Sequence, residues 1–157
     1  MSTMDKTIGW IGTGLMGLPM CRNLLKAGFG LSAFNPTVAK VAPLEALGAR
    51  RCATVAELAA SAPIVVSMVS DDKALLAVAL GPNGLLANAK SGTIYVDMST
   101  VTPMASSVVA NEAANHRIAY VRAPVSGGVA LAEAAKLTVV ASGSKDAYER
   151  CLPAFRR

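Results

Sequence analysis

Short apolar runs alternate with longer stretches of helical periodicity along most of the chain. Apolar runs bounded by turn-forming residues predict strands at residues 8–11, 31–34, 50–52, 64–68, 93–96, 118–121 and 137–141. Helical spacing of apolar positions predicts helices at residues 16–27, 37–47, 55–60, 71–80, 103–115 and from residue 146 onward. The sequence GPNG at residues 81–84 predicts a turn. Strands that alternate with helices favour an α/β fold whose doubly wound, mainly parallel sheet is covered on both faces.

The first predicted strand runs directly into Gly12-x-Gly14-x-x-Gly17, and a predicted helix follows. A dinucleotide-binding fingerprint requires this context. In such a turn the first glycine permits a tight bend, the second lets a pyrophosphate approach the backbone, and the third lets the helix pack against the strand. Free N–H groups and the helix dipole then hold the anion. We therefore predict a Rossmann dinucleotide-binding fold, although the same glycines can also serve simply as a turn.

The end of the second predicted strand bears on the choice of cofactor. An acidic residue at this place usually binds the ribose hydroxyls of NAD, whereas this chain has Asn35, Pro36 and Thr37. No carboxylate repels a 2′-phosphate, Thr37 can donate a hydrogen bond, and Lys40 can supply positive charge. The sequence therefore favours NADP over NAD. Thr37 also suits the cap of the following helix, and the two roles are compatible.

Composition narrows the class of protein. A chain of 157 residues with 53% hydrophobic and 4% aromatic residues suits a single domain with an aliphatic core. No apolar run reaches the roughly 18 residues of a membrane span. Cys21, Cys52 and Cys151 show no metal-ligand spacing, so they predict reduced thiols in a cytoplasmic protein without a metal site. The formal net charge is +5, but the basic residues are scattered and aromatics are scarce, which argues against nucleic-acid binding.

Several segments together resemble one enzyme family. IGWIGTGLMGLPMCRNLLKAGF at residues 8–29 closely resembles the N-terminal signature of the β-hydroxyacid dehydrogenases, which include 3-hydroxyisobutyrate dehydrogenase and tartronate semialdehyde reductase. The resemblance continues at VVSMVSDD (65–72), GTIYVDMSTVTP (92–103) and RAPVSGG (122–128), and covers essentially the whole chain. It extends to the NAD-binding domain of 6-phosphogluconate dehydrogenase. The family transfers hydride between a nicotinamide and a small 3-hydroxy acid or its semialdehyde, so residues 1–157 would be its NAD(P)-binding domain.

The resemblance also implies roles for individual residues. It assigns the pyrophosphate to the turn formed by Gly12, Thr13, Gly14, Leu15, Met16 and Gly17. Around the adenosine and the nicotinamide ribose it places Asn35, Pro36, Thr37, Met68, Val69 and Thr100, and Lys40 joins this cofactor site through its charge. NADP-preferring members often carry an arginine where this chain has Pro36, so a guanidinium clamp on the phosphate is missing.

The substrate carboxylate would lie on Ser126, Gly127 and Gly128, since the family binds it through this Ser-Gly-Gly segment. Backbone N–H groups of such a turn also form an anion-binding nest. The alternative is a flexible surface turn.

The resemblance implies that no catalytic residue lies within this chain. In the family a lysine that acts as general acid and base lies on a helix of a second, all-helical domain, which also makes the dimer, and this chain ends at Arg157 before that region. We expect a homo-oligomer for the longer parent and no turnover by the chain alone. His116, the single histidine, is expected to be a solvated helix-end residue. The alternative is a non-catalytic dinucleotide-binding module derived from this family.

Overall fold

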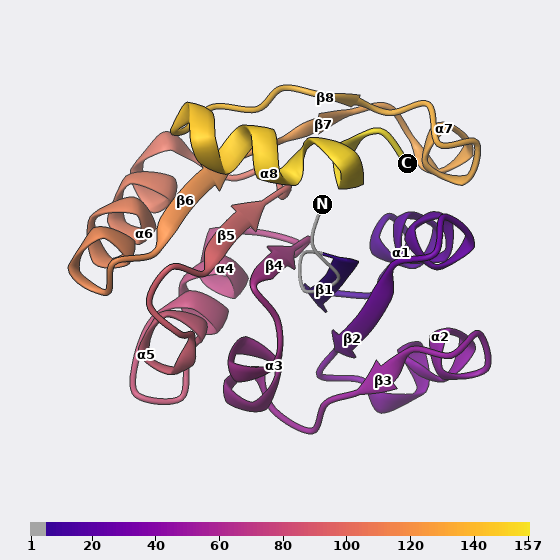
Figure 1. The fold of residues 1–157 in the computed structure, drawn as a ribbon, viewed down its shortest axis with the longest axis horizontal. Helices are drawn as coiled ribbons and strands as arrows, with labels where there is room; N and C mark the ends of the chain where they lie inside the picture. The colour runs from indigo at the N-terminus through magenta and orange to yellow at the C-terminus, as the bar shows by residue number, and fades with distance from the viewer. Residues whose placement is uncertain (1–5) are drawn as a thin grey trace.

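Six parallel strands form the central sheet of the computed structural model, which describes residues 6–157 (Figure 1). Their order is β3-β2-β1-β4-β5-β6. The strands are β1 (Thr7–Ile11), β2 (Gly30–Phe34), β3 (Arg50–Arg51), β4 (Ile64–Ser67), β5 (Ile94–Asp97) and β6 (Ala119–Arg122). This order is that of the doubly wound dinucleotide-binding fold, so the predicted fold class is confirmed.

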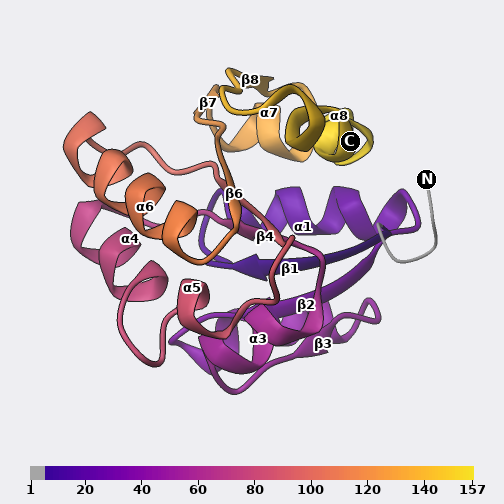
Figure 2. The ribbon, with the colours of Figure 1, turned by 60° about the vertical axis from the view of Figure 1, so that its left-hand side comes forward.

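Helices and short helical turns connect the strands and pack on both faces of the sheet (Figure 2). They are α1 (Gly17–Lys26), η2 (Val38–Lys40), α2 (Ala42–Glu45), α3 (Val55–Ser61), α4 (Asp72–Ala79), α5 (Leu85–Asn88), α6 (Pro103–Asn115), α7 (Val129–Glu133) and α8 (Lys145–Phe155). Four of them begin at a side-chain cap: Thr54, Asp71, Thr102 and Ser144 each accept the N–H three residues on. No helix among residues 6–157 is long and apolar enough to cross a membrane.

Successive residues of the central strands point to opposite faces of the sheet and pack into two separate hydrophobic cores. In β4, Ile64 and Val66 join the core beneath α1 and α8, whereas Val65 joins the core beneath α3 to α6. In β5, Tyr95 faces the second core, whereas its neighbours Ile94 and Val96 face the first. Because both faces of these strands are buried, their sequences are nearly continuous apolar runs. The predicted aliphatic composition of the core follows from the same two-sided burial.

The predicted helix at 37–47 is wrong as a single helix, because the chain forms η2 and then α2. Pro43 lies in the first turn of α2. A proline lacks the N–H that a continuous helix needs and restricts the residue before it, so the helix restarts there. Thr37 stands at the N-cap position of η2, but its side chain makes no capping hydrogen bond.

The strand predicted at 137–141 lies outside the parallel sheet. β8 (Thr138–Val139) pairs antiparallel with β7 (Val125–Ser126) in a separate two-stranded sheet. Residues 127–137 connect β7 to β8, and this connection is shorter than the dozen or more residues that a parallel crossover needs. The two-stranded sheet lies near α8, at the top of Figure 1.

Candidate dinucleotide-binding site

The glycine turn lies where the strand order reverses. β1 pairs with β2 on one side and with β4 on the other, so the crossovers from these central strands diverge. Ligands of open α/β sheets bind in the crevice outside the carboxyl ends of the strands at such a point. The end of β1 leads into Gly12, whose N–H donates to the carbonyl of Phe34 at the end of β2 (3.0 Å). The predicted turn is therefore at the place in the fold where a dinucleotide is expected.

Two of the three glycines are required by the protein itself. Gly12 has a φ of +98°, and a Cβ at this position would overlap the carbonyl oxygen of Met68. A Cβ on Gly17 would overlap the carbonyl oxygen of Gly12 and approach the indole nitrogen of Trp10. That nitrogen donates to the same Gly12 oxygen over 2.9 Å. The first and third glycines therefore permit the close packing of β1, α1 and β4.

Gly14 has a different explanation. An added Cβ would meet no described protein atom within 4 Å. The neighbouring Leu15 is 82% exposed, and no side chain caps α1 at Met16. An uncapped helix leaves N–H groups of its first turn available to an anion. The absence of a side chain at Gly14 thus leaves open space beside a site suited to a pyrophosphate.

A hydrogen-bond bridge joins the glycine turn to the loop after β2. The N–H of Thr13 donates to Asn35 Oδ1 (3.1 Å), and the Thr13 hydroxyl donates to the carbonyl of Lys40 (2.9 Å). Asn35 Nδ2 also donates to the carbonyl of Thr37 (3.2 Å). The loop from Asn35 to Lys40, including Pro36, is thereby held against the turn. The structure gives Asn35 a positioning role that the sequence did not reveal, while its contact with a ribose stays a prediction.

Met68 and Val69 complete this side of the site. The Met68 N–H donates to the carbonyl of Ile11 (2.9 Å), which continues the β1–β4 pairing up to the glycine turn. The Val69 N–H donates to the hydroxyl of Ser99 (2.8 Å), which links the ends of β4 and β5. Thr100 follows directly and lines an adjoining cleft. The structure therefore gathers the predicted residues from the ends of β1, β2, β4 and β5.

A buried polar network lies beneath the ends of β4 and β5. The Ser67 hydroxyl donates to Asp97 Oδ1 and shares a hydrogen bond with the Tyr95 hydroxyl, each over 2.8 Å. The Ser99 N–H also donates to Asp97 Oδ1 (3.2 Å). Asp97 is only 3% exposed, and this burial raises the pKa of its carboxyl; burial likewise raises the pKa of Tyr95.

Sequence reasoning missed this network. Its visible signal is a polar residue at the end of each of two apolar strands, IVVS and IYVD, which pair in register at Ser67 and Asp97.

Family comparison agrees with this geometry. Residues 7–157 match the model of the NAD binding domain of 6-phosphogluconate dehydrogenase. The chain belongs to this family. The predicted resemblance and the prediction of a nicotinamide dinucleotide-binding domain are therefore confirmed.

Relatives of this chain include hydroxyacid dehydrogenases about twice as long. The chain is 41% identical over 152 residues to 2-(hydroxymethyl)glutarate dehydrogenase from Eubacterium barkeri, covering 96% of this chain and 50% of that protein. Mycobacterium tuberculosis 3-hydroxyisobutyrate dehydrogenase, solved with L-serine, is 30% identical with a TM-score of 0.89; the match covers 96% of this chain and 50% of that one. A structure described as Psf3 in complex with NADP+ and 2-OPP is 30% identical with a TM-score of 0.91, covering 95% and 53%. The chain thus spans the dinucleotide-binding half of such proteins.

In this NAD-binding family domain, Ser126 ends β7, and Gly127 and Gly128 lead into α7. α7 is held to α1 because Asn23 Nδ2 donates to the carbonyl of Ala132 (2.7 Å). The Ser-Gly-Gly segment is therefore anchored through the helix that follows it, although its contact with a substrate stays a prediction.

His116 lies at the C-terminal end of α6, as expected. Its Nε2 is 3.1 Å from Glu112 Oε1, and its side chain is partly exposed. This local contact does not connect His116 with the residues gathered around the glycine turn.

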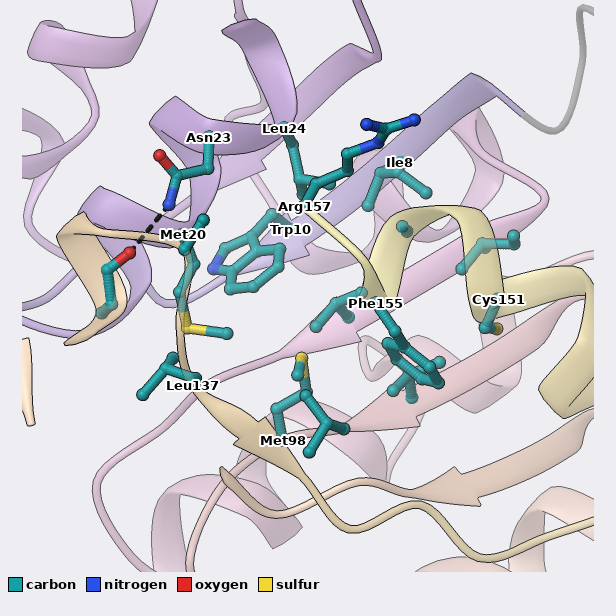
Figure 3. A pocket seen from close by; sticks show the side chains of 17 residues that line it. Ile8, Trp10, Met20, Asn23, Leu24, Met98, Leu137, Cys151, Phe155 and Arg157 are labelled. Carbon is teal, nitrogen blue, oxygen red and sulfur yellow. Dashed lines mark hydrogen bonds between the residues drawn. The ribbon is translucent and has the colours of Figure 1, made fainter. Parts of the chain in front are cut away.

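An apolar pocket of about 50 Å³ lies elsewhere, between the sheet and α1, α7 and α8 (Figure 3). Ile8, Trp10, Met98 and Phe155 are among its lining residues, with Arg157 at one side. The one hydrogen bond drawn within it joins Asn23 to α7. Most of its lining residues belong to the first core, so the pocket is a small cavity between packed side chains. Its volume is far too small for a dinucleotide.

Proposed function

We propose that this chain binds NADP or NAD and serves as the cofactor-binding part of an oxidoreductase acting on a small 3-hydroxy acid or its semialdehyde. The observation that carries the proposal is the open space at Gly14 beside the uncapped start of α1. Protein packing explains Gly12 and Gly17 but gives no reason for Gly14, whereas a bound pyrophosphate does. The hydroxyacid dehydrogenases among the relatives support the reaction class.

The chain's own residues would bind and orient the reactants. The turn from Gly12 to Gly17 holds the pyrophosphate, and Met68, Val69 and Thr100 position the remainder of the cofactor. The bound nicotinamide supplies hydride chemistry, which the protein alone cannot provide. Ser126, Gly127 and Gly128 bind the substrate carboxylate and set its distance from the nicotinamide.

We infer a preference for NADP over NAD. Asn35 offers no negative charge to repel a 2′-phosphate, and Lys40 is exposed at the end of η2, which follows directly. The structural relative solved with NADP+ supports this preference. Pro36 cannot replace a guanidinium, so the phosphate would be held by Lys40 and by the hydroxyl of Thr37.

We further propose that a separate helical domain supplies the general acid and base, and that the complete enzyme is a cytoplasmic homo-oligomer. Relatives twice the length of this chain support the first point. The exposed apolar side chains of Val129, Leu131 and Tyr148 support association. All three cysteines are buried and form no disulfide bond among residues 6–157, which suits a reducing compartment.

Energy transfer from Trp10 to bound NADPH tests the dinucleotide site. Trp10 is the single tryptophan of the chain, and its indole donates to Gly12 beside the proposed site. Titration with NADPH should quench Trp10 emission in a saturable way. Gly14→Val should abolish this response because the added side chain fills the space of the pyrophosphate. Gly30→Ala is the matched control, since a Cβ there makes only an ordinary 3.4 Å contact with Thr7. Equal NADPH affinity in wild type and Gly14→Val would refute the site.

A further inference from the structure

Arg122, at the end of β6, is a partly buried cation whose guanidinium has no acidic partner among residues 6–157. Its Nε donates to the hydroxyl of Ser106 on α6 (2.6 Å). Its guanidinium carbon lies 5.5 Å from the centre of the Tyr120 ring. The guanidinium is therefore fixed by neutral groups and forms no ion pair within the described part of the chain, although Asp97 is its register partner on β5.

Arg122 is anchored through both its backbone and its side chain. Its backbone N–H donates to the Ser142 carbonyl (2.9 Å), and its carbonyl accepts from the Ser142 N–H (2.7 Å). Ser106 is only 5% exposed, and its hydroxyl also lies 3.4 Å from the hydroxyl of Tyr120. Because Nε is used for anchoring, the two terminal nitrogens of the guanidinium are left for another acceptor. A guanidinium held in this way loses little conformational entropy when it binds an anion.

Arg122 lines an open cleft of about 410 Å³ at the end of β5, the start of α6 and the end of β6. Hydroxyl groups supply much of its polar lining: Ser99, Thr100, Thr102, Ser106 and Ser107. Thr100 is also the residue proposed to lie near the nicotinamide ribose. The cleft therefore adjoins the end of the dinucleotide site at which a substrate would react.

Two carboxylates lie in this neighbourhood, and both have other partners. Asp97 also lines the cleft, but its Oδ1 accepts from Ser67 and Ser99. Asp72 accepts from the N–H and the hydroxyl of Thr102 (2.8 and 2.6 Å). Neither forms an ion pair with Arg122. One fixed guanidinium with a buried carboxylate nearby suits a ligand group of one negative charge better than a doubly charged phosphate.

We propose that Arg122 binds a second carboxylate of the substrate, so that the substrate class is a dicarboxylic hydroxy acid or the corresponding semialdehyde. This inference rests on the proposed function, because Ser126, Gly127 and Gly128 hold the first carboxylate. Arg122 and the Ser-Gly-Gly segment follow each other along the chain with only three residues between them. Four extended residues span at most about 14 Å, which limits how far apart the two carboxylate sites can be. By binding the second carboxylate in this cleft, Arg122 would determine the specificity for dicarboxylic over monocarboxylic substrates.

Nuclear magnetic resonance on the whole chain tests this proposal directly. The Nε–H signal of Arg122 is followed while the dicarboxylate glutarate, the monocarboxylate butyrate or inorganic phosphate is added. Glutarate should shift the signal saturably and bind about tenfold more tightly than butyrate, as expected for one additional charged hydrogen-bonded contact. Equal affinities for glutarate and butyrate, or tighter saturation by phosphate, would overturn the assignment. An unchanged Arg122 signal with all three probes would overturn it as well, and would favour an acidic protein side chain as the partner of Arg122.

Three variants separate a positioned guanidinium from a general effect of charge. Arg122→Gln should lower glutarate affinity about tenfold and leave butyrate affinity nearly unchanged. Ser106→Ala keeps the net charge but releases Nε, so it should weaken glutarate binding several-fold. Arg22→Gln, at an exposed position on α1, makes the same charge change far along the chain from the cleft and should have no effect. Equal losses in Arg22→Gln and Arg122→Gln would refute the proposal.

Binding of NADPH, measured through Trp10 on the same samples, distinguishes this inference from the proposed function. A wild-type chain that binds NADPH but shows no glutarate response contradicts the role of Arg122 alone. Absence of NADPH binding contradicts the proposed function instead. If Arg122→Gln does not fold, Ser106→Ala and the wild-type titrations still decide the outcome.

Discussion

Gly12 and Gly14 are two residues apart and differ in what surrounds them. Gly12 has a positive φ and faces the carbonyl of Met68, whereas Gly14 faces open space. The sequence pattern treats them alike, as two positions of one fingerprint. Folding therefore requires a glycine at position 12, whereas the proposed ligand binding requires one at position 14, and substitutions at the two positions can separate these requirements.

We expect Gly12→Ala to lower the free energy of unfolding by at least about 2 kcal/mol, because alanine is strained at positive φ and its Cβ meets backbone. Gly14→Ala should change the same quantity by no more than about 0.5 kcal/mol. Denaturant unfolding of both variants measures this difference. Equal destabilisation would contradict the distinction drawn between the two glycines.

Cofactor choice is also a property of single residues. Asn35→Asp keeps an acceptor for the Thr13 N–H but adds a negative charge beside the proposed 2′-phosphate. It should lower the ratio of NADPH to NADH affinity about tenfold or more, which corresponds to about 1.4 kcal/mol. Lys40→Ala should lower the same ratio by removing a positive charge. Fluorescence titrations with both cofactors measure the ratio, and an unchanged value in Lys40→Ala would show that Lys40 does not contact the phosphate.

Among elements, β4 and β5 are joined beyond their backbone pairing by the network of Ser67, Tyr95, Asp97 and Ser99. Ser99 extends this link to the N–H of Val69. The carboxylate is buried without an ion-pair partner among the described residues. The network therefore joins the ends of β4 and β5, but burying the charged carboxylate of Asp97 costs folding free energy.

This cost predicts a pH-dependent effect of Asp97→Asn. Burial raises the pKa of Asp97 in the folded protein above its ordinary value of 3.8. The folded state therefore binds a proton more readily than the unfolded state, and the wild type gains stability as pH falls through the folded pKa towards 3.8. In the variant, the amide oxygen of the asparagine can accept the same hydrogen bonds without carrying a charge. Asp97→Asn should therefore raise the free energy of unfolding at pH 7 by on the order of 1 kcal/mol.

The advantage of Asp97→Asn should shrink across that acidic window. Denaturant unfolding at a series of pH values measures it. Ser67→Ala provides a comparison that removes one hydrogen bond to Asp97 without removing the charge. Stability curves of wild type and Asp97→Asn that stay parallel with pH would contradict a raised pKa.

For the whole molecule, the two helical layers enclose a complete sheet, but the chain spans only about half the length of its relatives. Val129 and Leu131 on α7 are 38% and 42% exposed. Tyr148 is likewise exposed on α8, which lies on the same side of the sheet as α7 (Figure 2). Neighbouring exposed apolar side chains, such as Val129 and Leu131 on α7, are typical of surfaces that meet another domain or chain.

The isolated chain should bind dinucleotide weakly, oxidise no 3-hydroxy acid and reduce no glyoxylate. General acid and base catalysis alone contributes about 10²–10⁴-fold to rates, and the proposed helical domain would supply this group together with part of the substrate's orientation. Nicotinamide absorbance with several substrates measures turnover, and sedimentation should detect self-association through α7 and α8. Robust turnover by the 157-residue chain would show that a catalytic group lies within it.

The sequence by itself determined the features that depend on local pattern. The glycine fingerprint, the alternation of strands and helices and the start of α8 within one residue all follow from short-range spacing and backbone preference. The central parallel sheet follows as well, because strands buried on both faces have continuous apolar sequences.

Only the tertiary structure decided which residues far apart in the chain meet. Thr13 reaches Asn35, Ser67 reaches Asp97, and Ser106 reaches Arg122, although 22, 30 and 16 positions separate the members of these pairs. The antiparallel pairing of β7 with β8 was likewise not visible in the pattern. Local spacing fixes the direction of a side chain within its own element, whereas its partner depends on how separate elements pack. The open space at Gly14 and the lack of an ion pair at Arg122 became visible for the same reason, since both are defined by their three-dimensional surroundings among residues 6–157.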